Sequence, residues 1–165
     1  MESLPGTLSS YADLGNKMAI ATNKAGLGYV ALLDGDAILT LFRKQDTHFL
    51  PPIAINAKGS VFVLQQFPDQ PQVVLGVIAP PDYQLTAVGH LSMPAAPLVM
   101  TNTSVTGLFA FGLQDGSVML VSPDAGQTAM FQAAYSPIGG LAFTGDGRYL
   151  AVASSEGIKV YAVMP

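Results

Sequence analysis

The segment LAFTGDGRYLAVASSEGIKVYAV, residues 141–163, consists of apolar runs that are interrupted by two glycine turns, at Gly147 and at Gly157. Tight hairpin turns require a positive φ, which glycine adopts without strain. The segment therefore predicts three strands of an antiparallel meander. The question that decides the fold is whether this meander is repeated along the chain.

The same plan recurs upstream, in segments that share apolar runs and glycine turns. These segments are AIATNKAGLGYVALLDGDAILTLF (residues 19–42), IAINAKGSVFVLQQ (residues 53–66) and LFAFGLQDGSVMLVSPDAG (residues 108–126). Gly59 and Gly147 are 88 positions apart, which is twice 44, and Ala110 and Ala151 are 41 positions apart. Repeats of about 40 residues with several strands each are typical of β-propeller blades.

Parts of these repeats resemble the WD40 type of propeller repeat. GSVMLVSPDAG (residues 116–126) is similar to the third strand and following turn of such a blade, and Gly89-His90 precedes it as a Gly-His pair does in that family. GDGRYLAVASSEGIKVYAV (residues 145–163) is similar to the last part of a WD40 array, with Tyr161 at the aromatic position. The resemblance implies an all-β fold of propeller blades, in which His90 is a hydrogen-bonding residue near a blade edge.

The chain departs from the family pattern at its signature pair. It has no tryptophan, and Val121-Ser122 and Tyr161-Ala162 stand where the family has Trp-Asp. The His–Ser–Asp–Trp hydrogen-bond network that stiffens the family's blades therefore cannot form. The resemblance covers residues 17–165, is strongest over residues 98–163, and concerns architecture alone.

We predict a single β-propeller-like domain over residues 1–165, built from about four antiparallel meander units. Their approximate bounds are 17–46, 49–85, 89–131 and 135–163. In this architecture the N-terminus often supplies the outer strand of the last blade. We therefore expect residues 1–16, through GTLSSYAD at 6–13, to close the ring and cover an edge that would otherwise be open.

The sequence leaves three outcomes open for the ring. The four units close by themselves, or two copies associate into an eight-bladed homo-oligomer, or the chain is one part of an incomplete propeller that another chain completes. The low charge and the apolar strands favour a large buried or shared surface. An ordinary β-sandwich with coincidental turn spacing is the competing fold.

The composition excludes several classes of function. Hydrophobic residues make up 50% of the chain and charged residues 11%, well below the roughly 25% of an average soluble domain. A net charge of −4 and a pI of about 4.8 argue against a basic face that binds nucleic acid. No run of about eighteen apolar residues predicts a membrane span, so we expect no direct membrane insertion.

The sequence does not fix the compartment. It contains no cysteine, which excludes disulfides, thiolate metal sites and a cysteine nucleophile but occurs in cytosolic and exported proteins alike. The segment MESLPGTLSS (residues 1–10) lacks the basic and apolar regions of a signal peptide. We expect a cytoplasmic protein by default, and an exported one if a signal has been removed.

The candidate chemical groups favour structural roles, and we expect no catalytic residue, cofactor or metal site. The two histidines, His48 and His90, lie 42 residues apart without carboxylates at ligand spacing. The serine pairs Ser9-Ser10 and Ser154-Ser155 lack a G-x-S-x-G setting. Five carboxylates lie in or beside glycine turns, where such side chains usually cap their own backbone. They are Asp34, Asp36, Asp115, Asp146 and Glu156.

The surface offers the remaining candidates. Three proline-rich connections, FPDQPQ (67–72), APPDYQ (79–84) and SMPAAP (92–97), predict stiff loops, because proline fixes φ and removes a backbone donor. Aromatic and arginine side chains are good interface anchors. The candidate partner-contact residues in and near these loops and turns are Phe67, Tyr83, Met93 and Arg148.

We therefore predict a non-catalytic protein–protein interaction scaffold, a propeller module of a larger assembly that binds protein partners. Two alternatives stay open. One is a propeller enzyme or small-ligand binder that uses carboxylates around a central channel, from among Asp34, Asp115, Asp146 and Glu156. The other is a structural subunit of an envelope or membrane complex.

Overall fold

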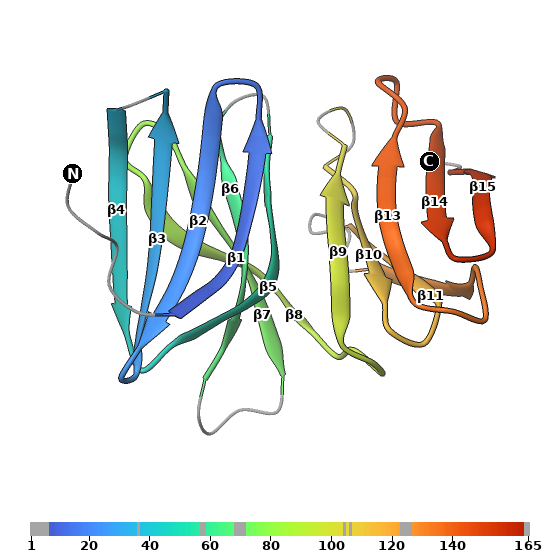
Figure 1. Ribbon diagram of the computed structural model, residues 1–165, viewed down its shortest axis with the longest axis horizontal. Helices are drawn as coiled ribbons and strands as arrows, with labels where there is room; N and C mark the ends of the chain where they lie inside the picture. Colours follow the sequence, from blue (N-terminus) through green and yellow to red (C-terminus); the bar gives the residue numbers. More distant parts are fainter. Residues whose placement is uncertain are drawn as a thin grey trace. The chain divides into compact units, whose positions relative to one another are not determined.

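The computed structural model describes residues 7–35, 37–56, 59–67, 72–103, 105, 107–122 and 127–163. All regular elements in these ranges are β-strands, and no helix there is long and apolar enough to cross a bilayer. Backbone contacts divide the chain into two compact units, Met1–Ser92 and Met93–Pro165, which are described separately below. Each unit contains two antiparallel sheets (Figure 1), as the meander pattern predicts.

The first unit consists of two four-stranded sheets whose strands are neighbours in chain order. Its first sheet contains β1 (Thr7–Leu14), β2 (Lys17–Lys24), β3 (Leu27–Asp34) and β4 (Ala37–Gln45). Its second sheet contains β5 (His48–Ile55), β6 (Val61–Gln66), β7 (Val73–Ala79) and β8 (Gln84–Leu91). Ala25 and Gly26, with φ of 49° and 79°, form a two-residue turn between β2 and β3.

The N-terminal segment lies elsewhere than predicted. Residues 7–14 form β1, which pairs with β2 in a register that joins Leu14 to Lys17. This strand therefore belongs to the first sheet and not to the last one. Gly15, at φ 64°, allows a two-residue turn, and so short a hairpin loop costs far less entropy than pairing with the opposite end of the chain. The first meander consequently begins at Thr7 rather than at residue 17.

The Gly89-His90 pair also belongs to an earlier meander than predicted. Both residues lie in β8, where Gly89 pairs with Leu75 and His90 with Val74 of β7. The hairpin between β7 and β8 has a short turn, so β8 follows β7 along its whole length and ends the second sheet at Leu91. The side chain of His90 is exposed on this outermost strand.

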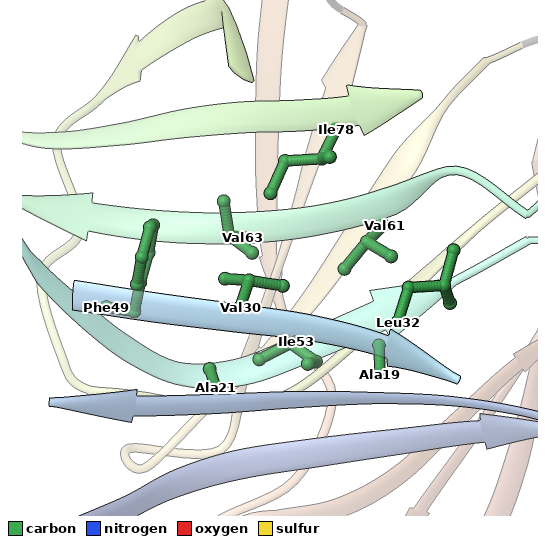
Figure 2. Packing of buried hydrophobic residues seen from close by; sticks show 9 residues of the cluster. All are labelled: Ala19, Ala21, Val30, Leu32, Phe49, Ile53, Val61, Val63 and Ile78. Atoms are coloured by element: carbon green, nitrogen blue, oxygen red, sulfur yellow. The ribbon is translucent and has the colours of Figure 1, made fainter. Parts of the chain in front are cut away.

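The core of the first unit lies between its two sheets (Figure 2). Its buried side chains are Ala19, Ala21, Val30 and Leu32 from the first sheet, and Phe49, Ile53, Val61, Val63 and Ile78 from the second. The Phe49 ring also makes an edge contact with Phe42 at 6.4 Å between centroids. A Cβ at Gly28 would lie 2.7 Å from the Phe49 ring, so the glycine makes room for it. Burial of this apolar area is the main force that joins the two sheets.

Two polar side chains lie next to Phe49. Asn23 donates from Nδ2 to the Phe49 carbonyl (2.8 Å) and accepts from the Phe49 amide (2.9 Å), which ties β2 to β5. Gln65 pairs with Phe49 across the second sheet and is buried, with no hydrogen-bond partner for its Oε1. An unpaired buried oxygen of this kind costs about 1–3 kcal/mol.

The second unit consists of a four-stranded and a three-stranded sheet. The four-stranded sheet contains β9 (Pro97–Asn102), β10 (Phe109–Leu113), β11 (Ser117–Ser122) and β12 (Gln127–Gln132). The three-stranded sheet contains β13 (Ile138–Phe143), β14 (Tyr149–Ser154) and β15 (Gly157–Ala162). These last three strands are the meander predicted from residues 141–163.

Buried side chains from both sheets and from the β12–β13 connector form the core of the second unit. They are Ala110, Val118, Ala133 and Ala134 on one side and Ile138, Leu150 and Val152 on the other. A Cβ at Gly112 of β10 would lie 2.5 Å from Ile138 Cγ2 and 2.7 Å from Val99 Cγ2. The glycine thus lets the two sheets approach closely.

Candidate interaction surface

The four predicted partner-contact residues lie two in each unit. In the first unit, Phe67 is half-buried with Lys44 Nζ 5.4 Å from its ring centroid, and Tyr83 packs against the core. In the second unit, Met93 is the first residue and is half-buried, and Arg148 is exposed in the β13–β14 turn. Arg148 is therefore the member of this set that offers most of its side chain to a partner.

Asp115 and Asp146 cap their own turns, as predicted. Asp115 Oδ1 accepts hydrogen bonds from the Ser117 hydroxyl (2.6 Å) and amide (3.0 Å). Asp146 Oδ1 accepts from the Thr144 hydroxyl (2.6 Å) and the Arg148 amide (3.0 Å). The hydrogen bond from the side chain of Ser117 does most to lower the pKa of Asp115, and that from Thr144 does most to lower the pKa of Asp146. Both carboxylates are therefore fixed anions rather than proton donors at neutral pH.

Asp34 and Glu156 differ from the self-capping prediction, because the side chain of each binds residues outside its own turn. Asp34 lies opposite Lys17 in the sheet, at 3.3 Å from its Nζ, and accepts a hydrogen bond from Asn16. Glu156 binds a connector that lies about twenty residues upstream, described below. Asp36 lies outside the described residues. Within the described ranges no group of three His, Asp or Glu side chains could hold a metal ion.

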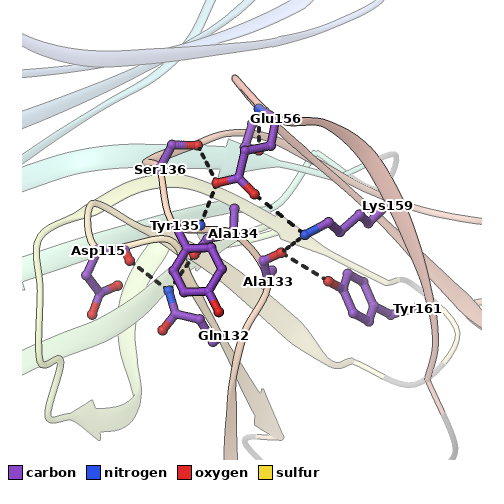
Figure 3. A network of polar contacts seen from close by, with 10 residues as sticks. Asp115, Gln132, Ala133, Ala134, Tyr135, Ser136, Glu156, Lys159 and Tyr161 are labelled. Atoms are coloured by element: carbon purple, nitrogen blue, oxygen red, sulfur yellow. Dashed lines mark hydrogen bonds and ion pairs between the residues drawn. The ribbon is translucent and has the colours of Figure 1, made fainter.

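The connector between β12 and β13, residues 133–137, is held on one side by the β10–β11 turn (Figure 3). The amides of Ala133 and Ala134 donate to the Gly116 carbonyl at 3.1 and 3.0 Å. Gln132 Nε2 donates to the Ala134 carbonyl at 2.5 Å. Gly116 has φ 84°, and a Cβ there would collide with the Ala134 carbonyl. The turn and the connector therefore fit together because residue 116 is glycine.

The other side of the connector is held by the last strand and the turn before it. Lys159 Nζ and the Tyr161 hydroxyl both donate to the Ala133 carbonyl, at 2.7 and 3.3 Å. Glu156 Oε1 accepts from the Tyr135 amide at 2.6 Å, and Glu156 Oε2 lies 3.7 Å from Lys159 Nζ. Figure 3 shows these contacts converging on one short stretch of backbone.

Tyr135 combines a fixed backbone with a free side chain. Its side chain is 94% exposed, the largest value among the described large hydrophobic residues. Tyr135 was not among the residues predicted from the sequence, because it lies outside the three proline-rich connections. A usable signal exists in the segment AAYSP (133–137), where one large aromatic follows two small residues and precedes a proline.

A small groove lies elsewhere in the second unit, beside the turn that carries Arg148. Its volume is about 240 Å³. It is lined by Thr101, Asn102, Thr103, Leu141, Ala142, Phe143, Thr144 and Gly145. Hydroxyl, amide and backbone groups there can form hydrogen bonds, but no lining residue is a charged or basic group that could activate a nucleophile.

Comparison with known proteins identifies the fold of the chain but does not assign it to a family. No protein-family model and no curated protein sequence matches the chain. A chain in the crystal structure of the mitotic checkpoint complex aligns with a TM-score of 0.65 and 14% identity, over 96% of this chain and 49% of that one. Sqt1 from Chaetomium thermophilum aligns with a TM-score of 0.63 and 17% identity, over 96% of this chain and 43% of that one.

A third structure, that of Chaetomium thermophilum Sqt1 bound to the N-terminus of the ribosomal protein L10, gives a TM-score of 0.61 and 16% identity. This alignment covers 96% of the present chain and 46% of the other. The likeness shows the fold: the chain is all-β and consists of WD40-like β-propeller blades, as predicted. The chain spans about half the length of the solved chains it matches.

Proposed function

We propose that the chain is a non-catalytic protein-interaction module that binds a segment of a partner protein around Tyr135. The observation that carries the proposal is an almost fully exposed aromatic ring on a backbone that is held from both sides. Tyrosine is enriched among the residues that dominate binding energy at protein interfaces.

The rigidity of the connector supports this role. A loop that is already ordered loses little conformational entropy on binding, so more of the contact energy appears as affinity. The anchors of the connector come from the β10–β11 turn and from β15 with its preceding turn, and they do not depend on the side chain of Tyr135. The tyrosine ring is therefore available to a partner without loss of an internal contact.

The charges near Tyr135 indicate the chemistry of the partner. Asp115 and Glu156 belong to the two turns that hold the connector, and both are exposed. Glu156 already lies 3.7 Å from Lys159 Nζ, so Asp115 is the carboxylate that is left to meet a basic group of a partner. The pKa of Asp115 is lowered by its hydrogen bonds with Ser117, so it stays anionic. A segment with an apolar residue beside a lysine or arginine fits this surface. One neighbour of the same fold, Sqt1, is bound to the N-terminus of another protein, which supports a protein segment as the ligand.

The proposal is tested by selecting a random peptide library on the full chain and comparing variants. We expect enriched peptides with a basic residue beside an apolar one, and Tyr135→Ala should weaken their binding at least about tenfold. Leu98→Ala is the matched control, because Leu98 is an exposed apolar residue of β9 in the same unit. Equal binding to Tyr135→Ala and to the unmodified chain would rule out this surface.

A further inference from the structure

The last sheet buries one face and leaves the other open. Leu150 and Val152 of β14 lie on the buried face. The cross-strand register defines the opposite face, which we call the trailing face. It consists of Gly140, Ala142, Tyr149, Ala151, Ala153, Ile158, Val160 and Ala162. No residue of this face is charged, and Ile158 and Val160 are 74% and 65% exposed. An open apolar surface of this kind marks an interaction site.

The first sheet also has an open face, on the side away from its buried core. Its register places bulky side chains there, and we call this surface the leading face. Its large apolar members are Leu8, Tyr11, Met18, Ile20, Tyr29, Leu33 and Ile38. Tyr11 is 64% exposed and Ile38 is 55% exposed. The leading face is thus bulky where the trailing face is mostly small.

The first unit shows how such faces fit together. On the buried side of its first sheet, the second strand carries Ala19 and Ala21. These small side chains share one core with Phe49 and Ile53 from the first strand of the following sheet (Figure 2). Small residues on one sheet therefore accommodate large residues on the next, which is how close packing is achieved.

The second unit repeats the arrangement. The second strand of its first sheet carries Ala110 and Gly112; Ile138 of the following sheet packs against Gly112 and shares one core with Ala110. In the last sheet, Ala151 and Ala153 occupy the corresponding second strand, β14. They form the same strip of small residues, but it lies on the open trailing face.

We infer that the trailing face of one copy of this chain packs on the leading face of a second copy. Small residues of the trailing face meet large residues of the leading face, and Arg43, which the register places on the leading face opposite Tyr29, lies on the outer strand β4. The matched solved chains are about twice as long as this one, so two copies together have about the length of one such chain. The surface differs from the one around Tyr135, and the two proposals can fail independently.

This contact is heterologous, because two different faces of the same chain meet. Such contacts either close into a ring or continue into an open assembly. We expect a closed dimer, in which both copies use both faces. A contact between two trailing faces, or a contact with a different protein, gives other results in the experiment below.

The first experiment measures the solution mass of the full chain by light scattering on a gel-filtration peak. We expect twice the chain mass of 17.2 kDa. Ile158→Lys on the trailing face and Ile38→Lys on the leading face should each weaken association at least about tenfold. Leu98→Lys, at an exposed residue outside both faces, is the control. A monomer of unmodified chain at high concentration would overturn the inference and point to a different partner for these faces.

Mixing the two variants tests which faces meet. The Ile158→Lys chain keeps an intact leading face, and the Ile38→Lys chain keeps an intact trailing face. An equimolar mixture should therefore form a heterodimer through one interface, although each variant alone is mostly monomeric. If trailing faces pair with each other, Ile38→Lys alone would stay dimeric and the mixture would gain nothing, which would contradict the inference. Thermal melting of each variant verifies that it is folded.

Discussion

The two units use the aromatic residue near their sheet-to-sheet connection in opposite ways. In the first unit, Phe49 follows the connection into β5 and is 1% exposed, with its backbone bound by the side chain of Asn23. In the second unit, Tyr135 lies in the connection into β13 and is 94% exposed, with its amide bound by Glu156. Both backbones are fixed by a side chain from another strand or turn. The difference is that one ring packs in the core and the other is exposed to solvent.

Truncation of the two rings gives the largest expected difference between the units. Phe49→Ala removes a fully buried ring and should lower the free energy of unfolding by about 3–5 kcal/mol. Tyr135→Ala should change it by less than about 0.5 kcal/mol, because the ring makes no buried contact. Urea unfolding followed by far-UV circular dichroism measures both. A comparable loss for the two variants would contradict the division of roles.

A second comparison sets two glycines of positive φ against each other. Gly116→Ala brings a Cβ into the Ala134 carbonyl and should cost about 2–3 kcal/mol, whereas Gly15→Ala meets no atom within 4 Å and should cost about 1 kcal/mol. The larger loss is expected in the second unit, where turn and connector touch. Thermal unfolding of both variants provides the measurement, and equal losses would mean that the connector is not tightly held.

The smallest expected effect concerns acid stability. The pKa of Asp115 is lowered from its ordinary value of 3.8 by the side-chain and backbone hydrogen bonds from Ser117. Its stabilising contribution is therefore complete above the unfolded-state pKa and is lost as the pH falls through the lower folded-state pKa. Because the carboxylate is exposed, the effect is small. Asp115→Asn should slightly reduce the fall in melting temperature between pH 5 and pH 2. If the melting temperature of the variant depends on pH as strongly as that of the unmodified chain, this carboxylate does not contribute to acid stability.

The fold could be predicted from the sequence because each tight turn needs a glycine of positive φ at a definite position between two strands. Gly26, Gly116 and Gly147 have positive φ in the structure, and each was visible as a glycine between apolar runs. The place of β1 was missed, because TLSSYADL alternates poorly and its hairpin depends on the two residues Gly15 and Asn16. Local sequence patterns predict where strands and turns lie. Which strands pair depends in addition on the entropy of closing the loop between them.

The candidate surface was harder to predict than the fold. Tyr135 is an aromatic residue that could equally have been buried, and its exposure depends on Gly116 and Glu156, each about twenty residues away. Tyr83 and Phe67 show the reverse: both are aromatic residues in proline-rich loops, and both are partly covered. Residue type alone does not separate these cases, because long-range contacts decide which ring stays outside.

The anchoring of the connector by Glu156, Lys159 and Tyr161 has a consequence for the exchange of backbone amides. These anchors belong to β15 and to the turn before it, so the connector is fixed while this strand is in place. A ligand that binds the fixed connector binds that state more tightly than one in which the strand has opened, and it therefore stabilises the strand. Occupancy of the surface around Tyr135 can then be read from slower hydrogen exchange in β15, a strand that the ligand need not touch.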